Sequence, residues 1–189
     1  IPEKYGGAGL PLRAASVILE EIHRCGANGA ACHAQMYIMG SLLKHGSEEL
    51  KQKYLPDIAN GKIRLQAFGV TEPSSGSDTL SIKTSAKKSG SKFVINGQKV
   101  WTSRAEHSDL ILLLTKTDSL PEKKKNLSLF LIDMRPHLNK SIFIKPIKTM
   151  INHSSTEIFF ENLEVDEECL VGSLGYGFQY ILDGMNAER

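Results

Sequence analysis

The chain has 189 residues and a formal net charge of +2 at pH 7. This length allows one large domain or two small ones, and so small a charge excludes the strong basic field used to bind nucleic acid or membrane surfaces. The cysteines, Cys25, Cys32 and Cys169, have no C-x-x-C spacing. Their pattern argues against a disulfide framework and a zinc site, and favours a reducing compartment. No apolar run is long enough to span a bilayer, and the first residues resemble neither a signal peptide nor a basic transit peptide.

The first third of the chain has helical periodicity. Apolar residues between Pro11 and Arg24 recur at helical spacing, which predicts an amphipathic helix. The run from Ala30 to Lys44 is apolar on nearly every face and predicts a buried helix. Ser47, followed by two glutamates, predicts the start of a third helix, which we expect Pro56 to break or reset.

After Gly61 the pattern changes to short apolar or alternating runs, which predict strands. Asn96-Gly97 predicts a type I′ hairpin turn between two of them, because both central residues of that turn need positive φ. The run from Gly177 to Arg189 predicts the start of another helix. The candidate strands are 64–70, 81–88, 92–95, 98–103, 110–116, 127–133, 142–148 and 156–165.

Several familiar site patterns are missing from the sequence. No H-E-x-x-H spacing indicates a zinc protease, and no G-x-S-x-G indicates an α/β-hydrolase. Cys32-His33 is interpreted as a packed pair within the buried helix, rather than as a metal or thiolate site. The glycines between Gly172 and Gly177 have the wrong order for a dinucleotide fingerprint, so we interpret them as a turn into a helix.

The stretch FGVTEPSSGSD, residues 68–78, follows a predicted strand. Pro73 removes one amide donor and Gly76 permits an unusual φ, which leaves other amides and hydroxyls free to bind an anionic or heteroaromatic ligand. An ordinary serine-rich turn would explain the loop equally well. The binding interpretation is favoured by Trp101-Thr102-Ser103, expected on the second strand of the Asn96-Gly97 hairpin, because tryptophan beside hydroxyl residues suits a planar cofactor.

Several independent motifs, in one order and over almost the whole chain, resemble the acyl-CoA dehydrogenase family. Agreement of many motifs in one order is more specific than any single motif. The matching stretches are Ile1 to Leu10, His45 to Lys51, Leu55-Pro56 with Ala59-Asn60-Gly61, Val70 to Pro73 with Gly76-Ser77-Asp78, Asn96 to Lys99 with Trp101-Thr102-Ser103, Ser108-Asp109, and Gly172 to Gly177.

The resemblance implies an α+β fold. We expect an N-terminal helical domain in residues 1–63, a flavin-binding middle β domain of two packed sheets in 64–174, and the start of a C-terminal helical domain in 175–189. Family chains are considerably longer, so the resemblance implies that the C-terminal helical bundle is absent. The 189-residue chain alone is therefore expected to be inactive, and the full-length protein to be a homo-dimer or homo-tetramer.

The resemblance also implies FAD as the cofactor, and the histidine and cysteine spacings give no reason to expect a metal. By analogy the Thr71 hydroxyl lies near the reactive N5 of the flavin, and backbone donors at the other edge of the ring stabilise the charge that appears on reduction. Glu72 and Asp78 are interpreted as structural residues that hold the turn. The cofactor-binding residues implied are Phe68, Val70, Thr71, Ser77, Trp101, Thr102 and Ser103.

The activity implied is α,β-dehydrogenation of an acyl-CoA thioester to the 2,3-enoyl-CoA, which requires a carboxylate to remove the α-proton. Some family types carry that carboxylate in a segment ending Glu-Arg, and others carry it further downstream. The run from Met185 to Arg189 resembles the first arrangement, so Glu188 is the expected base. A plain ion pair on a helix face is the alternative for Glu188. Asn186, Arg189 and Ser77 match positions that contact substrate in relatives.

The sequence departs from the family pattern in three places. The residue between Trp101 and Ser103 is polar, the segment 148–154 lacks the usual glycine and arginine, and Asp166 stands where proline is common. These departures bear on the substrate class more than on the cofactor.

The resemblance further implies that electrons pass to an electron-transfer flavoprotein, in the bacterial cytoplasm or the mitochondrial matrix. One alternative is an acyl-CoA oxidase or related flavin oxygenase, in which dioxygen is the acceptor. The other is a non-catalytic β-domain binding module that holds no flavin. Neither a nucleic-acid partner nor a membrane span is expected.

Overall fold

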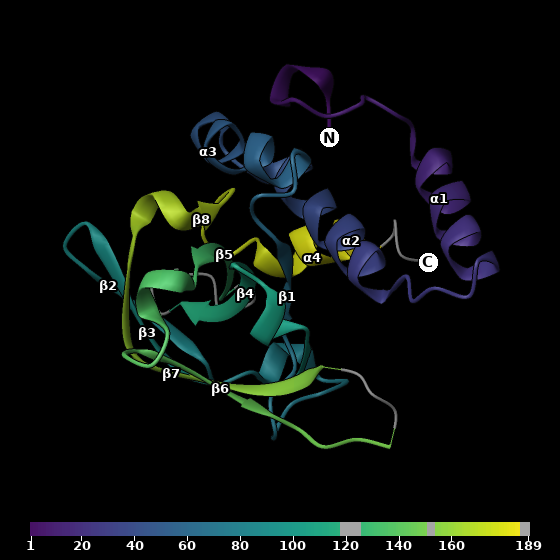
Figure 1. The fold of residues 1–189 in the computed structure, drawn as a ribbon. Helices are drawn as coiled ribbons and strands as arrows, with labels where there is room; N and C mark the ends of the chain where they lie inside the picture. The colour runs from purple at the N-terminus through teal and green to yellow at the C-terminus, as the bar shows by residue number, and fades with distance from the viewer. Residues whose placement is uncertain (118–125, 151–153, 186–189) are drawn as a thin grey trace.

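The computed structural model describes residues 1–117, 126–150 and 154–185. Three helices come first: α1 (Leu12–Arg24), α2 (Ala30–His45) and α3 (Glu48–Ala59). A β domain follows, and α4 (Gly177–Met185) then returns to pack beside α2, so that the helices gather on one side of the sheet (Figure 1). This arrangement confirms the predicted α+β class, with a helical part followed by a β domain.

The strands form one mixed sheet. Its order is β6-β7-β3-β2-β4-β5-β8, and β1 pairs in parallel with β4 beside this path. Within the described residues there are eight strands: β1 (Leu65–Gly69), β2 (Ser85–Ser89), β3 (Lys92–Ser103), β4 (Leu110–Thr117), β5 (Leu127–Asp133), β6 (Ile142–Pro146), β7 (Ser155–Asp166) and β8 (Leu170–Val171).

Strand β4 lies at the centre and is buried on both faces. Leu110, Leu112 and Leu114 pack into the core shared with the helices. Ile111 and Leu113, which point the opposite way, pack into a second core within the β domain. Because a strand alternates its side chains, a continuous apolar run is what burial on both faces requires.

The second core exists because the sheet folds back on itself. The rings of Phe93 in β3 and Phe130 in β5 lie 5.1 Å apart, edge to face, although β2 and β4 separate their strands in the sheet. The sequence predicts two packed sheets. The structure contains two packed halves of one hydrogen-bonded sheet.

The predicted hairpin at Asn96-Gly97 is wrong. Strand β3 runs through these residues and pairs with β2 on one side and β7 on the other, with a bulge between Ile95 and Gly97. Gly97 has φ +151°, and a Cβ there would lie 2.5 Å from the Thr84 hydroxyl. The glycine is therefore required by a close approach inside the sheet, while the hairpin turn lies at Gly90, with φ +62°, between β2 and β3.

Pro56 does not break α3, which continues to Ala59. Leu55 and Ile58, on either side of it, are buried in the helix-facing core, and the Pro56 carbonyl still accepts a hydrogen bond from the Asn60 amide at 3.1 Å. Proline costs the helix its own amide bond, and burial of these neighbours offsets that loss. Strand β2 begins at Ser85, later than predicted, because residues 79–81 form a 3-10 turn.

Helices α2 and α4 pack closely through small and polar residues. A Cβ on Gly184 would collide with the Ser41 hydroxyl, which donates a hydrogen bond of 3.0 Å to the Tyr180 carbonyl. His45 Nε2 lies 2.7 Å from the Asp183 carboxylate, and Lys44 Nζ lies 2.9 Å from it. Hydrogen bonds from Lys44 and His45 lower the pKa of Asp183.

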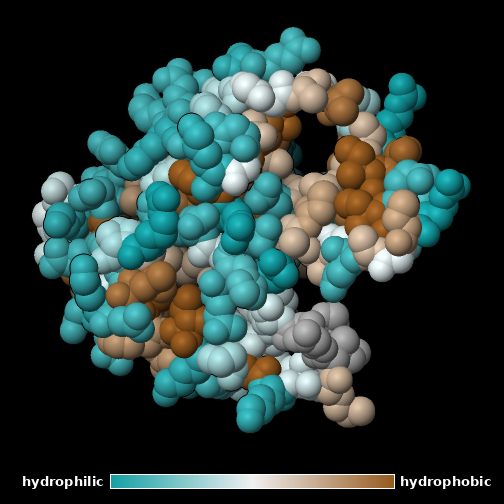
Figure 2. Space-filling view, in the orientation of Figure 1, coloured by the Kyte–Doolittle hydropathy of each residue, from teal (hydrophilic) through white to brown (hydrophobic). Residues whose placement is uncertain are grey.

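Helix α1 lies against α2, and none of its residues is buried. Leu12, Val17 and Ile18 are exposed, and Figure 2 shows apolar side chains gathered over this helix. Within the three described ranges, no helix combines the length and the apolar character needed to cross a membrane.

Candidate functional site

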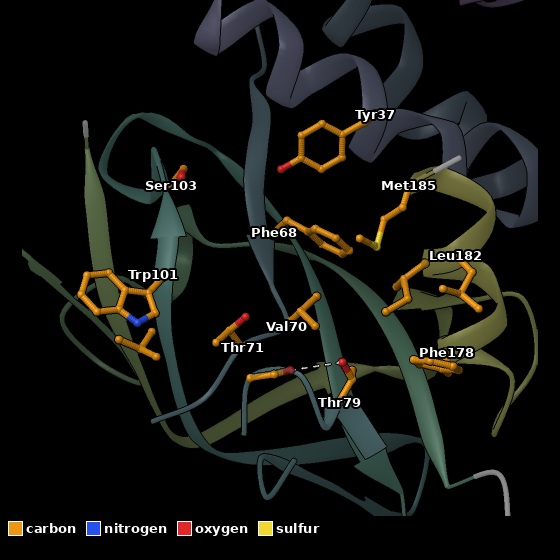
Figure 3. A pocket seen from close by; sticks show the side chains of 13 residues that line it. Tyr37, Phe68, Val70, Thr71, Thr79, Trp101, Ser103, Phe178, Leu182 and Met185 are labelled. Carbon is orange, nitrogen blue, oxygen red and sulfur yellow. Dashed lines mark hydrogen bonds between the residues drawn. The ribbon is translucent and has the colours of Figure 1, made fainter. Parts of the chain in front are cut away.

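A cavity of about 400 Å³ lies between the sheet, α2 and α4 (Figure 3). One end is polar and is lined by Thr71, Gly76, Thr79, Trp101 and Ser103. The other end is apolar and is lined mainly by Tyr37, Phe68, Val70, Phe178, Ile181, Leu182 and Met185. A volume in this range is typical of small-molecule sites.

Five of the predicted site residues meet in this cavity: Phe68, Val70, Thr71, Trp101 and Ser103. The first three come from the end of β1 and the residues that follow it, and the other two from the end of β3. The two segments are joined by a hydrogen bond of 2.9 Å from the Val100 amide to the Thr71 carbonyl. The structure therefore brings together stretches about thirty positions apart in the sequence.

A bulge in β3 places Trp101 at the rim of the cavity. The pairing with β7 shifts between Lys99 and Thr102, and Trp101 has φ +60°. A bulky residue with positive φ is strained, and such strain is found at functional sites. The indole is 60% exposed and lies at the outer edge of the lining residues in Figure 3, where its flat face is open to a ligand.

Thr102 and Ser77 lie differently from the other predicted residues. Thr102 is buried and does not line the cavity, and its hydroxyl has no hydrogen-bond partner among the described residues. Its carbonyl accepts a bond of 2.8 Å from the Thr156 hydroxyl. Ser77 is exposed beside Gly76, which does line the cavity. Cofactor binding by Thr102 and Ser77 stays a prediction.

Beneath the cavity lies a buried ion pair. Lys99 is fully buried, and its Nζ donates to Glu72 Oε1 at 2.8 Å and to the Val70 carbonyl at 2.9 Å. Glu72 also accepts from the amides of Lys83, at 2.6 Å, and Thr84, at 2.9 Å. Glu72 therefore holds the turn, as predicted, and Lys99 fixes the carbonyl that precedes Thr71.

Burial and charge act on this pair in opposite directions. Burial lowers the pKa of Lys99 to about 8, although Glu72 acts to raise it. Burial alone would raise the pKa of Glu72, but hydrogen bonds from Lys99, Lys83 and Thr84 and the charge of Lys99 bring it below its ordinary value. Glu72 is therefore ionised near neutral pH, and Lys99 remains largely protonated there.

The turn that follows Glu72 is held by its own side chains. The Ser75 hydroxyl donates to the Asp78 carbonyl, and the Ser81 hydroxyl donates to the Asp78 carboxylate. Within the described part of the chain, the amides of Gly76 and Ser77 find no acceptor. These two donors are available to a ligand.

The predicted base Glu188 and the predicted substrate residues Asn186 and Arg189 lie outside the described residues. Met185, the last described residue, lines the cavity. In the ranges that the structure covers, no group of three or more His, Cys, Asp or Glu side chains could hold a metal ion.

Sequence reasoning missed several residues of this site, among them Tyr37 in the cavity wall and Lys99 in the ion pair beneath it. Tyr37 is one aromatic in a helix that is apolar on nearly every face, so the pattern could not single it out. Lys99 interrupts the apolar alternation of its strand, and a buried lysine needs an acidic partner. The acidic partner that could have pointed to Lys99 is Glu72, which the sequence analysis interprets only as a structural residue of the turn.

Comparison with known protein families shows which family this chain belongs to. The model of the acyl-CoA dehydrogenase middle domain matches residues 67–163, and that of the acyl-CoA dehydrogenase N-terminal domain matches residues 1–62. The chain belongs to the acyl-CoA dehydrogenase family.

Known acyl-CoA dehydrogenases match along the whole chain. Cyclohex-1-ene-1-carbonyl-CoA dehydrogenase from Syntrophus aciditrophicus is 35% identical over 100% of this chain and 46% of its own length. The mitochondrial short/branched chain specific acyl-CoA dehydrogenase of Rattus norvegicus is also 35% identical, over 100% of this chain and 44% of its own length. The chain spans about half the length of the curated relatives it matches.

A solved structure outside the dehydrogenases is also similar. The crystal structure of the prolyl acyl carrier protein oxidase AnaB superposes with a TM-score of 0.89 at 28% identity, covering 100% of this chain and 50% of that one.

Acyl-CoA dehydrogenases use FAD, and the residues of this cavity fit a flavin. The exposed indole of Trp101 offers a flat apolar surface, and the hydroxyls of Thr71 and Ser103 offer hydrogen bonds at its side. The available amides of Gly76 and Ser77 are donors of the kind that bind phosphate oxygens. Flat apolar surface, hydroxyls and amides together make up a donor set suited to a flavin nucleotide.

Proposed function

We propose that the protein is a flavin-dependent enzyme that removes hydrogen from the α- and β-carbons of an acyl-CoA thioester and gives the 2,3-enoyl-CoA. The observation that carries this proposal is the cavity, with its exposed indole and hydroxyls at one end and its apolar end between β1, α2 and α4. The similarity to dehydrogenases named for cyclohex-1-ene-1-carbonyl-CoA and for short or branched acyl-CoA supports the substrate class.

The polar end would hold FAD, through Trp101, Thr71 and Ser103. When bound, FAD supplies the acceptor for the hydride that leaves the β-carbon. Lys99 holds the Val70 carbonyl, and through it keeps the Thr71 hydroxyl in place at the cavity wall. A donor held in position before reaction needs no rearrangement when charge develops beside it.

The apolar end would bind the acyl group. Phe68, Val70, Ile181 and Leu182 exclude water from the carbons that react, which strengthens electrostatic interactions there. Glu188, three residues after Met185 in the sequence, would remove the α-proton as a carboxylate. The alternative for the base is a carboxylate further along the full-length protein.

We further propose an electron-transfer flavoprotein as the electron acceptor. Dioxygen is the second candidate, because the chain is similar to a prolyl acyl carrier protein oxidase. The rate at which air reoxidises the reduced flavin separates the two candidates. Slow reoxidation would support the protein acceptor, and fast reoxidation would support an oxidase.

We also propose a cellular location and an oligomeric state for the full-length protein. Relatives from Syntrophus aciditrophicus and from rat mitochondria support the bacterial cytoplasm or the mitochondrial matrix. A homo-dimer or homo-tetramer is proposed for the full-length protein, and its mass in solution tests that state.

The deciding experiment uses the protein expressed from its complete open reading frame and loaded with FAD. The protein is mixed without oxygen with acyl-CoAs of increasing length, and the visible flavin absorbance is followed. Bleaching by at least one acyl-CoA is the expected result. A protein that takes up no flavin would instead support a non-catalytic binding module.

Glu188→Gln tests the base in the same assay. The variant keeps the size of the side chain and removes its basicity, so bleaching should slow by about 10²–10⁴-fold while the flavin spectrum before mixing is unchanged. Bleaching at the native rate would show that another residue is the base.

A further inference from the structure

The cavity has a smaller neighbour, and one side chain lies between the two. The neighbour has a volume of about 120 Å³ and lies between α1 and α2. Its walls are Leu12, Ala15, Ser16 and Leu19 from α1, with His33 and Met36 from α2. Tyr37 lines both cavities.

The Tyr37 ring is held in place from two directions. It packs edge to face on Phe68 with ring centroids 6.0 Å apart, and it meets the His33 ring at 5.3 Å. Figure 3 shows it reaching from α2 over Phe68 at the edge of the main cavity. Aromatic pairs at these separations are attractive, so the ring acts as a fixed wall.

Tyr37 lines the main cavity next to Phe68, on the side that the acyl group would enter. That cavity, at about 400 Å³, is near the lower limit for small-molecule sites, yet it would have to hold part of a flavin as well as the acyl group. Little length remains for a hydrocarbon chain before it meets the tyrosine ring.

We propose that Tyr37 sets the upper limit on the length of the acyl chain, by separating the main cavity from the small cavity between α1 and α2. The inference rests on the proposed function and names its substrate class: short or branched acyl-CoA thioesters. Beyond the ring, Leu12, Ala15, Leu19 and Met36 offer apolar surface to a longer chain, beside the polar Ser16 and His33.

The test measures binding as well as rate in the FAD-loaded protein made from its complete open reading frame. Binding of 2,3-enoyl-CoA products of increasing length is measured by calorimetry, because products bind without turnover. Each added methylene should tighten native binding about fourfold until the chain reaches Tyr37, after which the gain stops.

Four variants test the chain length at which this gain in affinity stops, which we call the break. Tyr37→Ala should move it to longer chains, because the two cavities merge. Tyr37→Phe keeps the ring and should keep the same length limit. Tyr37→Ala combined with Ala15→Phe, which fills the small cavity, should return the break toward the native length, and Ala15→Phe alone should leave the native profile unchanged.

The outcomes separate the two proposals. If no acyl-CoA bleaches the native flavin, the proposed function fails and the length limit fails with it. If the native protein bleaches but Tyr37→Ala keeps the native break, only the role of Tyr37 is overturned. Should Tyr37→Ala lose its flavin, Tyr37→Leu removes less of the wall, and an unmoved break in that variant overturns the inference equally.

Discussion

Replacing Lys99 by methionine should destabilise the protein strongly. Methionine is close to lysine in size but carries no charge, so Glu72 would stay buried as an unpaired carboxylate. Removing one partner of a buried pair costs about 3–5 kcal/mol. Glu72 keeps two amide donors, from Lys83 and Thr84, which places the expected cost near the lower value. Loss of the bond to the Val70 carbonyl adds about 1 kcal/mol.

The assay is urea unfolding of the native and Lys99→Met proteins, with the free-energy difference taken from the shift in midpoint. Lys88→Met is the matched control, because Lys88 pairs with Glu167 at the same distance of 2.8 Å, with side chains 44% and 48% exposed. An exposed pair contributes at most about 1 kcal/mol. If Lys99→Met costs no more than Lys88→Met, the reasoning from burial is wrong.

Three further outcomes are expected. Burial lowers the pKa of Lys99 from 10.5 to about 8, so the unfolded chain binds that proton more tightly. The native protein should therefore gain stability relative to Lys99→Met as pH rises from about 8 to about 10, by up to about 1.4 kcal/mol per pH unit. Urea titrations of both proteins across this pH range check the prediction. A free-energy difference between them that does not change with pH contradicts it. Trp101→Gly should weaken FAD binding, measured by flavin fluorescence. The flavin-free variant should be no less stable in urea than the native protein, because glycine adopts φ +60° without strain at this exposed position. An unchanged FAD affinity would show that Trp101 does not bind the cofactor. Gly97→Ala should cost more than about 1 kcal/mol, because the added Cβ meets Thr84 at a strained φ; a native urea midpoint would refute this.

The helices and most strands could be predicted, because their signals are local. The apolar run in α2 and the continuous run in β4 each reflect burial of the whole element. The prediction of a hairpin turn at Asn96-Gly97 was wrong because the same dipeptide also suits a β-bulge. Only the pairing with partner strands decides between a turn and a bulge.

The site could be predicted only in part, for the same physical reason. Thr71 and Trp101 stand in recognisable motifs, and the structure brings them together. Simple alternation could not place Thr102, because the bulge before it changes which residues face the core. Tyr37 carries no local signal, since its position depends on how α2 packs against β1 and α1.

The contact between α2 and α4 has a consequence for synthesis of the protein on the ribosome. The hydrogen bond from Ser41 to Tyr180 joins residues 139 positions apart. At a translation rate of about 5–20 residues per second, α2 would wait on the order of 10 s for the helix that covers it. During that interval Ile38 and Leu42, fully buried in the finished fold, lack part of their partner surface. The apolar residues that α2 turns toward α4 therefore stay without that cover until the later helix is made.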